Sequence, residues 1–484
     1  MTPREQLRKA VIWVSILLIT VAAVLLQRMR PEDDAAVASD EGGFVEERAG
    51  AESEPAPNIA PVAMPAELVA KLTVAMRSLA PTLDAEQMLG QAEDLKEGEF
   101  ADRLGYAVMI GYFDSWREGI DRAKEIALPE DAVDEARALR DGVITAMQLR
   151  EELAAGGDEE GRGALNAAEP LRPTLGYIAD VLGPDAVAKA SSAIVGLVGA
   201  IAWYVAAFLG GLVVLVVLLV LHAQGKMRAA FEPAASPNSS ANTMLVLGET
   251  FVIWILSFLA LNVLSVAFIT PVVAGFGESA SLLVSLAVML GSLAVLVYPT
   301  LRGVSGTELR RVIGLHSGRG VVTEIGQGIL CYLSAVPLLA AGLVVFAILS
   351  AVAKMLEGPT PPPSHPAVEM LGGAGGMRLF LLYMLASVAA PIVEETMFRG
   401  VLYGHLRGAV MPRIRVGSMI VAALASSVVF AIIHPQGVLF VPALGGLAVA
   451  FCIFREMRGS LIAPMVAHGI NNAVTLTLGV LLLG

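Results

Sequence analysis

The hydrophobic and polar positions divide the chain into long apolar stretches and one amphipathic region. The first apolar stretch covers residues 10–27. Eight more follow, at residues 191–221, 243–274, 279–299, 326–353, 378–406, 416–434, 437–454 and 460–482. A helix needs roughly 20 apolar residues to cross a bilayer. The pattern therefore predicts an all-α polytopic membrane protein with about nine transmembrane helices.

The region between the first and second apolar stretches is water-soluble in character. Residues 31–65 are rich in Glu, Asp, Ala and Pro and predict an acidic disordered linker. In residues 66–189, apolar side chains recur at three- and four-residue steps, which predicts a helical extramembrane domain. Its expected helices cover residues 66–79, 85–107, 114–127 and 131–153. Stacked helical hairpins remain an alternative, and a partner-binding or spacer role is the default interpretation.

Charge separates the same two parts of the chain. Residues 31–190 hold 34 of the 45 acids and 14 of the 33 bases, a balance of −20, which leaves 11 acids and 19 bases, or +8, elsewhere. The apolar content of 56% excludes an ordinary soluble enzyme. No basic cluster interleaved with aromatic residues indicates nucleic-acid binding. The two cysteines, Cys331 and Cys452, lie in apolar segments and indicate no disulfide framework.

Basic loops alternate with base-poor loops along the apolar part of the chain. By the positive-inside rule, this alternation predicts a cytoplasmic N-terminus, an extracytoplasmic helical domain and an extracytoplasmic C-terminus. The expected location is the cell membrane, as a multi-pass protein of a bacterial inner membrane.

The first apolar segment has two interpretations. It could be a signal peptide, because residues 36–38 (Ala-Val-Ala) resemble a cleavage site. However, Arg28, Arg30 and an acidic cluster separate the apolar run from that site. We therefore expect an N-terminal transmembrane anchor over residues 1–30. The remaining predicted divisions are transmembrane helices at 190–357, a Pro/Gly-rich loop at 358–376 and a C-terminal domain at 377–484.

The strongest candidate chemistry lies in residues 394–400, Glu-Glu-Thr-Met-Phe-Arg-Gly, which follow the charge-free residues 379–393. A charge at bilayer depth costs roughly 2.5 to 3.5 kcal/mol on insertion scales, so such groups pair or line a wet cavity. Glu395 and Arg399 are four apart and are expected to pair on one helix face. Glu394 points about 100° away and is left as a surplus carboxylate, which suits a general base. The alternative is a structural ion pair, with Glu394 facing a loop.

Other ionisable residues near the apolar segments are expected at their ends. Glu249 and Glu324 lie close to segment boundaries, so both are expected to reach the membrane interface. His405 lies among Gly404, Arg407 and Gly408 and is expected to be interfacial.

Two histidines extend the candidate site. Phe430 and His434 are four apart on one helix face, as are His468 and Asn472. A glutamate can take a proton from water, and histidine and asparagine can donate hydrogen bonds to an oxyanion. This set of residues suits hydrolysis, and no serine elbow, paired aspartate or His-Glu-x-x-His helix suggests a different hydrolytic mechanism. Straight full-length helices would nevertheless place the two histidines at different depths, so either the 416–434 segment enters partway or the helices are strongly tilted.

These motifs resemble the CAAX-prenyl-protease and bacteriocin-processing (CPBP, or Abi) intramembrane proteases, also called type II CAAX endopeptidases. The family pattern Glu-Glu-x-x-x-Arg, Phe-x-x-x-His and His-x-x-x-Asn/Asp is matched in order, as is the Gly-Ser-Leu step at residues 459–461. The resemblance covers residues 375–482. The matching positions are Glu394, Glu395, Arg399, Phe430, His434, His468 and Asn472.

The resemblance implies a helical membrane core that cuts peptide bonds of membrane-associated substrates. By analogy, Glu394 is the base; His434, His468 and Asn472 bind water and oxyanion; Glu395, Arg399 and Phe430 support the geometry. The expected chemistry is metal-free, and zinc at Glu394, His434 and His468 is the alternative. The expected partners are a membrane-associated protein or peptide substrate, the lipid bilayer and a protein partner of residues 66–189. A proton-coupled transporter and a non-catalytic membrane scaffold are the competing functions.

Overall fold

The computed structural model describes residues 3–28, 64–79, 84–92, 95–96, 98–129, 132–154, 167–183, 186–226, 241–357, 376–409 and 415–483. Every regular element within these ranges is helical, which confirms the all-α prediction for this part of the chain. The chain divides into two compact units. We call Met1–Arg30 with Ile201–Thr477 the membrane unit, and Pro31–Ala200 with Leu478–Gly484 the helical unit. The predicted linker at 31–65 and loop at 358–376 lie almost wholly outside the described residues.

The helical unit is a set of short amphipathic helices around one apolar core. Leu104, Val108, Met147 and Ile178 are fully buried in that core. Its elements are α2 (Met64–Leu79), α3 (Ala85–Leu89), η2 (Gly90–Ala92), α5 (Phe100–Phe113), α6 (Trp116–Glu125), α7 (Val133–Ala154), η3 (Glu169–Leu171), α9 (Arg172–Leu175), α10 (Tyr177–Val181) and the first part of α11 (Ala186–Ala223).

The prediction of one continuous helix over residues 85–107 of this unit is wrong. The chain forms α3 and η2 first and begins a new helix, α5, at Phe100. Glu99 and Asp102 form a reciprocal capping box at that start, which satisfies backbone N–H groups that a helix end leaves free. Periodicity alone overlooked this capping signal.

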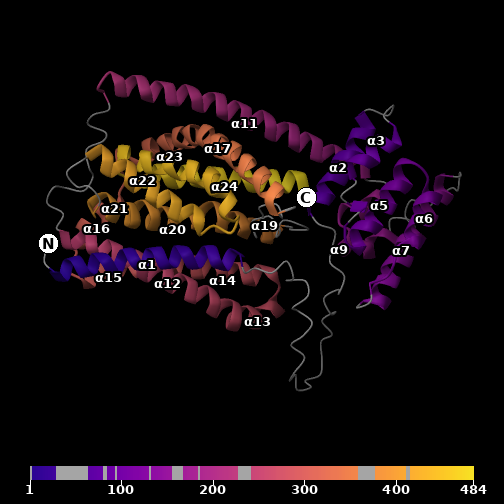
Figure 1. Ribbon diagram of the computed structural model, residues 1–484, viewed down its shortest axis with the longest axis horizontal. Coiled ribbons are helices and arrows are strands. Elements are labelled where there is room, and N and C mark those ends of the chain that lie inside the picture. The colour runs from indigo at the N-terminus through magenta and orange to yellow at the C-terminus, as the bar shows by residue number, and fades with distance from the viewer. Residues whose placement is uncertain are drawn as a thin grey trace, which may run out of the picture. The chain divides into compact units, whose positions relative to one another are not determined.

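The membrane unit is a bundle of helices that run side by side along its long direction (Figure 1). Its first elements are α1 (Pro3–Arg28), the rest of α11, α12 (Ala241–Leu264), η5 (Ser265–Ile269), α13 (Thr270–Val273), η6 (Ala274–Phe276), α14 (Glu278–Gly291), η7 (Ser292–Leu296), α15 (Val297–Leu301), α16 (Gly306–Ile313) and α17 (Val321–Glu357). The C-terminal elements are α19 (Gly376–Tyr383), η8 (Met384–Ala389), α20 (Ala390–Glu394), η9 (Glu395–Leu402), α21 (Tyr403–Ala409), α22 (Arg415–Ile432), η10 (Val438–Phe440), α23 (Val441–Arg458) and, up to Thr477, α24 (Ile462–Leu483).

Six helical stretches among the described residues are long and apolar enough to cross a bilayer. They are Ile194–Ala223, Asn242–Val273, Ser279–Leu301, Val321–Leu356, Gly376–Ala409 and Val438–Arg458, and Val416–Ile432 is a shorter apolar helix. These six spans support a multi-pass membrane protein. The helices α1 and α24 match two further predicted segments without being among the six, so the count of nine remains a prediction.

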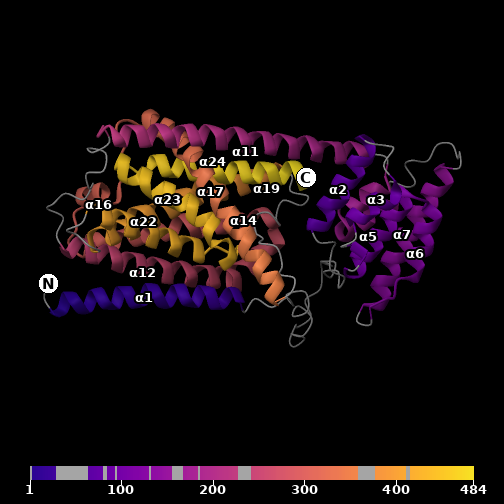
Figure 2. The ribbon, with the colours of Figure 1, turned by 45° about the horizontal axis from the view of Figure 1, so that its top comes forward.

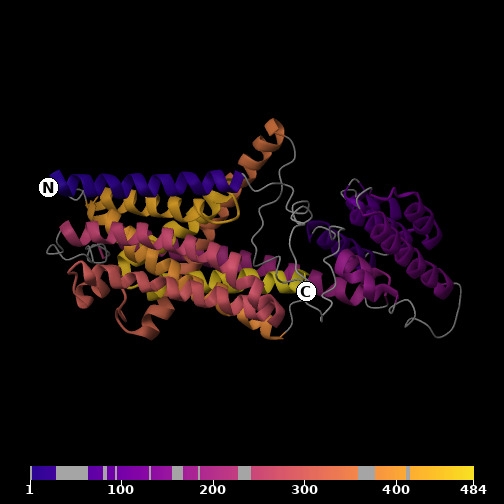
Figure 3. The ribbon, with the colours of Figure 1, turned by 90° about the horizontal axis from the view of Figure 1, so that it is seen from below.

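Helix α1 lies along the outside of the membrane unit, beside α12 (Figures 2 and 3). Its side chains Ile12 and Ile16 are buried in the bundle. Arg8 Nε donates to Glu249 Oε1 at 2.8 Å, and Lys9 Nζ donates to the Ala409 carbonyl at 2.9 Å. These contacts attach α1 to the bundle, and the retained anchor stays a prediction.

Two residues expected at the membrane interface, Glu324 and His405, are buried within the protein. Glu324 is fully buried, because Arg458 approaches it with Nε at 3.0 Å and Nη2 at 2.6 Å. His405 is also fully buried, and its Nδ1 donates to the Met244 carbonyl at 2.7 Å. Both residues found partners on segments remote in sequence, which the local pattern did not reveal.

Helices α17 and α23 pack closely together beside the candidate site. A Cβ added to Gly446 would lie 2.5 Å from the Leu338 carbonyl oxygen, and one added to Gly342 would lie 2.2 Å from the Pro442 carbonyl oxygen. Small residues allow membrane helices to approach closely in this way. The neighbouring Gly445 faces open space, with nothing within 4 Å of an added Cβ.

We expect Gly446→Ala to destabilise the membrane unit by about 1 to 3 kcal/mol, because the added methyl group forces the two backbones apart. Gly445→Ala, the matched control, adds the same methyl group to the same helix without a clash. Thermal unfolding in detergent measures both variants. Equal unfolding midpoints for the two would contradict the packing shown at this crossing.

Candidate active site

The candidate site is organised by the helical span Gly376–Ala409, which contains two π-wound segments. The first, η8, precedes Pro391, and the second, η9, begins directly after Glu394. Wider π-type turns inside α-helices occur frequently at functional sites. Here Pro391 has no N–H, so one carbonyl of the preceding turn cannot be paired within the helix.

Asn472 supplies the missing hydrogen bond. Its Nδ2 donates to the Ala386 carbonyl at 2.8 Å, the oxygen five residues before Pro391. Its Oδ1 accepts from Asn471 Nδ2 at 3.3 Å. An amide nitrogen carries two hydrogens, so Asn472 retains one N–H for another acceptor.

The predicted pairing of Glu395 with Arg399 is present. Arg399 Nη1 donates to Glu395 Oε1 at 2.9 Å, and both side chains are fully buried. The pair lies on the buried face of the helix, as the four-residue spacing predicted.

Aromatic rings complete the surroundings of Arg399. The guanidinium carbon lies 4.2 Å from the centroid of the Phe430 ring and 5.2 Å from that of Phe451. Ring faces attract a cation and contribute up to about 2 kcal/mol when it is desolvated. The rings therefore compensate part of the cost of burying an arginine whose Nε and Nη2 have no hydrogen-bond partner.

Glu394 faces the two predicted histidines. Its Oε2 lies 3.7 Å from His434 Nε2 and 3.8 Å from His468 Nε2, and it is buried without a hydrogen-bond partner. These separations are too long for direct hydrogen bonds. The structure thus brings the surplus carboxylate and both histidines to one point.

Each histidine is oriented through its other nitrogen. His434 Nδ1 donates to the Phe430 carbonyl at 2.6 Å, and His468 Nδ1 donates to Glu395 Oε1 at 2.9 Å. A carbonyl and an ion-paired carboxylate accept hydrogen bonds, so both Nδ1 atoms carry the proton. In the neutral rings, the Nε2 atoms facing Glu394 then carry lone pairs.

The short length of α22 explains how His434 reaches this point. Ser418 Oγ donates to the Arg407 carbonyl and Ser426 Oγ to the Phe398 carbonyl, so α22 runs antiparallel to η9 and α21. With 18 residues it extends about 27 Å, roughly half the length of the 34-residue Gly376–Ala409 span. It ends level with Glu394. Because the Gly376–Ala409 span is about 51 Å long, a helix of about 27 Å brings His434 to the middle of that span, where Glu394 lies.

Part of the chain is similar to known proteins. Residues 376–474 match the family described as Type II CAAX prenyl endopeptidase Rce1-like. The membrane-embedded CAAX protease MroQ of Staphylococcus aureus (strain USA300) is 28% identical over 95 residues, which are 20% of this chain and 38% of that protein. This chain thus spans well under half the length of that relative. No solved structure matches.

The C-terminal region is a CPBP-family domain.

The CPBP domain opens into a cavity of about 640 Å³, within the usual range for a ligand site. Glu394, His434, His468 and Asn472 lie along its wall. Most other lining residues are apolar. They include Leu385, Ala390, Phe430, Phe440, Leu444, Leu447, Phe451 and Leu476.

Helices that precede the CPBP domain complete the same cavity. Tyr204 and Phe208 come from α11, Met289 comes from α14, and Val336 and Leu339 come from α17. The cavity is therefore not built by residues 377–484 alone. The motifs gave no signal for these walls, because the contributing residues are ordinary apolar or aromatic positions in membrane helices.

Three further polar or aromatic residues at the CPBP site were not predicted from the sequence. Phe451 stacks on His468 with ring centroids 5.6 Å apart, while Gln436 and Asn471 line the cavity. Gln436 follows His434 by two residues, and Asn471 precedes Asn472. Their closeness in sequence to a predicted site residue is the signal that could have identified Gln436 and Asn471.

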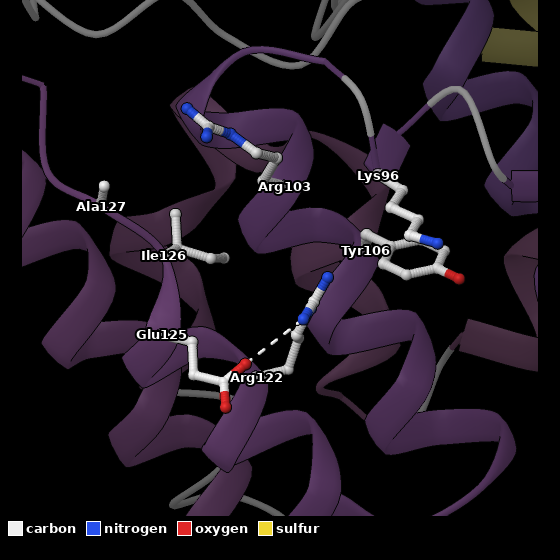
Figure 4. Close-up of a pocket in the computed structure, with 7 residues that line it drawn as sticks. All are labelled: Lys96, Arg103, Tyr106, Arg122, Glu125, Ile126 and Ala127. Carbon is white, nitrogen blue, oxygen red and sulfur yellow. Dashed lines mark hydrogen bonds and ion pairs between the residues drawn. The ribbon is translucent and has the colours of Figure 1, made fainter.

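A second cavity, of about 300 Å³, lies in the helical unit (Figure 4). It is lined by Lys96, Arg103, Tyr106, Arg122, Glu125, Ile126 and Ala127. Its acid, Glu125, pairs with Arg122 at 3.3 Å, and both side chains are solvent-exposed. This lining has no arrangement of base and oxyanion donors, so the CPBP cavity is the candidate active site.

The candidate site has one feature typical of a zinc site and one that does not match zinc geometry. Histidine ligands of zinc commonly donate their second N–H to a carbonyl or carboxylate, as both histidines do here. However, two ligands of one tetrahedral zinc are about 3.3 Å apart, given bonds of about 2.0 to 2.1 Å. The separations of 3.7 and 3.8 Å are longer, and within the described ranges no group of three His, Cys, Asp or Glu residues is arranged to hold a metal ion.

We expect Glu395→Gln to destabilise the CPBP domain by about 3 to 5 kcal/mol, because it leaves the buried Arg399 charge without its partner. The double variant Glu395→Gln/Arg399→Met removes both charges and should lose less stability than the two single variants added together. Thermal unfolding in detergent measures all three. If the stability lost by the double variant equals the sum of the losses of the two single variants, Glu395 and Arg399 are not coupled.

Proposed function

We propose that this protein is an intramembrane endopeptidase in which Glu394 activates water to hydrolyse peptide bonds of membrane-associated substrates. The observation that carries the proposal is the position of the Glu394 carboxylate. It faces two histidines in an apolar cavity, and its Oε2 has no hydrogen-bond partner. The match to the Rce1-like family and to a CAAX protease favours peptide hydrolysis over the transporter and scaffold alternatives.

The charges of the site suit this chemistry. Glu394, Glu395 and Arg399 together carry one surplus negative charge, and one protonated histidine would bring the formal charge to zero. His468 is placed for this role, because it donates to Glu395 and lies 3.8 Å from Glu394. A protonated His468 has an Nε2–H for water or substrate.

In the proposed reaction, water lies between Glu394 Oε2 and the histidine Nε2 atoms. Glu394 takes one proton from the water as its oxygen attacks the peptide carbonyl carbon, and the carbonyl electrons move to oxygen. The oxyanion accepts hydrogen bonds from the remaining Asn472 N–H and from a protonated histidine. As the C–N bond breaks, Glu394 returns its proton to the leaving amine, which gives an amine and a carboxylic acid, and the acid then loses its proton to water.

The cavity is suited to a substrate segment that arrives from the membrane. Its walls are mainly apolar, and the polar groups lie around Glu394. The eukaryotic branch of the family that the chain resembles trims prenylated C-termini, so a farnesylated peptide and an unprenylated apolar peptide are both suitable probes. We propose the cell membrane as the location and a membrane-associated protein as the substrate.

The first test replaces the base. Glu394→Gln has the same shape but cannot accept a proton from water, so turnover should fall to background while folding is retained. Cleavage of the two internally quenched peptides by full-length protein in detergent measures the rate. Glu118→Gln, an exposed position in the helical unit, is the control and should match wild type. Wild-type rates in Glu394→Gln would refute the assignment.

The second test concerns metal. For a glutamate site, purified active protein should contain well under one metal ion per chain, and a strong chelator should leave the cleavage rate unchanged. His468→Ala should still lower turnover, by about 3 to 4 kcal/mol in transition-state stabilisation, because it removes an oxyanion donor. A stoichiometric metal whose removal abolishes activity and whose addition restores it would establish zinc chemistry instead.

A further inference from the structure

The connection between α22 and α23 places a polar side chain in the cavity that the proposed reaction does not use. Gln436 lines the cavity, and its Oε1 is buried with no hydrogen-bond partner. A buried acceptor without a hydrogen-bond partner costs free energy, so a glutamine at this position lowers the stability of the free protein.

The backbone around Gln436 is held in a tight turn. Pro435 restricts its own backbone, and Gly437 has a φ of +85°, which favours glycine. Because α22 ends level with Glu394, this non-helical connection also lies at that level. Irregular backbone at membrane depth is tolerated where it lines a cavity. The turn therefore fixes Gln436 close to His434, which precedes it by two residues.

The chemistry of Oε1 limits what it can bind. A carboxamide oxygen accepts hydrogen bonds, so its partner must be a donor. Among the groups of a peptide substrate, the backbone N–H is the donor that every sequence carries, and a segment crossing an apolar cavity must satisfy it. His434 is among the groups proposed to act on the scissile bond, so a donor at Gln436 belongs to a residue near that bond.

We propose that Gln436 is a substrate-binding residue that accepts a hydrogen bond from a backbone N–H next to the scissile peptide bond. The role rests on the proposed function of the cavity and adds a contact that the family motifs do not contain. It positions any extended peptide, irrespective of its side chains.

The test combines a variant with altered substrates. Gln436→Met keeps the length and volume of the side chain and removes the acceptor. A set of probe peptides, each with one backbone N–H replaced by an ester oxygen, removes the donor one position at a time. The probes are the farnesylated and unprenylated peptides above, with the cleavage site first located by mass spectrometry.

We expect Gln436→Met to lower kcat/KM for the all-amide peptide by roughly three- to tenfold, as for one lost hydrogen bond. One ester position should cost wild type a similar factor and cost Gln436→Met nothing further. The unfolding midpoint of Gln436→Met should equal or exceed that of wild type, because Oε1 has no partner to lose. Leu424→Met, on the exposed face of α22, is the matched control and should change none of these values.

If the losses in kcat/KM caused by Gln436→Met and by the ester add at every ester position, the inference is overturned. A lowered unfolding midpoint of Gln436→Met that accounts for its lost activity would also overturn it. Binding of the same peptides to Glu394→Gln separates this inference from the proposed function. If wild type cuts neither peptide but the loss of affinity at one ester position depends on Gln436, the proposed function fails and binding of a backbone N–H by Gln436 stands. If neither peptide binds, the role of Gln436 is refuted.

Discussion

The membrane unit depends on one interaction above the others, the burial of Arg399 against Glu395 inside an apolar bundle. Such a pair is costly to desolvate and is stable only when its geometry is good and its neighbours compensate. Here the neighbours are the faces of Phe430 and Phe451, which come from α22 and α23. Burial of one arginine therefore fixes how these two helices pack against the span Gly376–Ala409.

The same pair also orients the candidate site. Glu395 accepts from Arg399 and from His468 through one oxygen, so the ion pair sets the direction of the His468 ring and turns Nε2 towards Glu394. Glu394 and Glu395 are adjacent in sequence but have different roles, because successive helical positions point in different directions. One carboxylate is used for structure, and the other is left without a partner in a cavity, where it is available for chemistry.

The helices outside the CPBP domain have a part in the site as well. Their side chains close the cavity, and ion pairs such as Glu324–Arg458 hold α17 to the end of α23. The close glycine contacts between α17 and α23 add to this attachment. A cavity shared by helices from both parts of the membrane unit gives the chain a way to shape substrate binding without altering the motif residues.

The sequence by itself determined the helical class, the apolar segments and the Glu395–Arg399 pair, because each follows from local periodicity and helix geometry. It also selected Glu394, His434, His468 and Asn472 as one set, through a motif pattern. Only the tertiary structure decided that α22 ends level with Glu394, that Asn472 completes the turn before Pro391, and that His405 and Glu324 are buried. These features arise from contacts between segments far apart in the chain, where a partner's position, rather than local pattern, determines burial and hydrogen bonding.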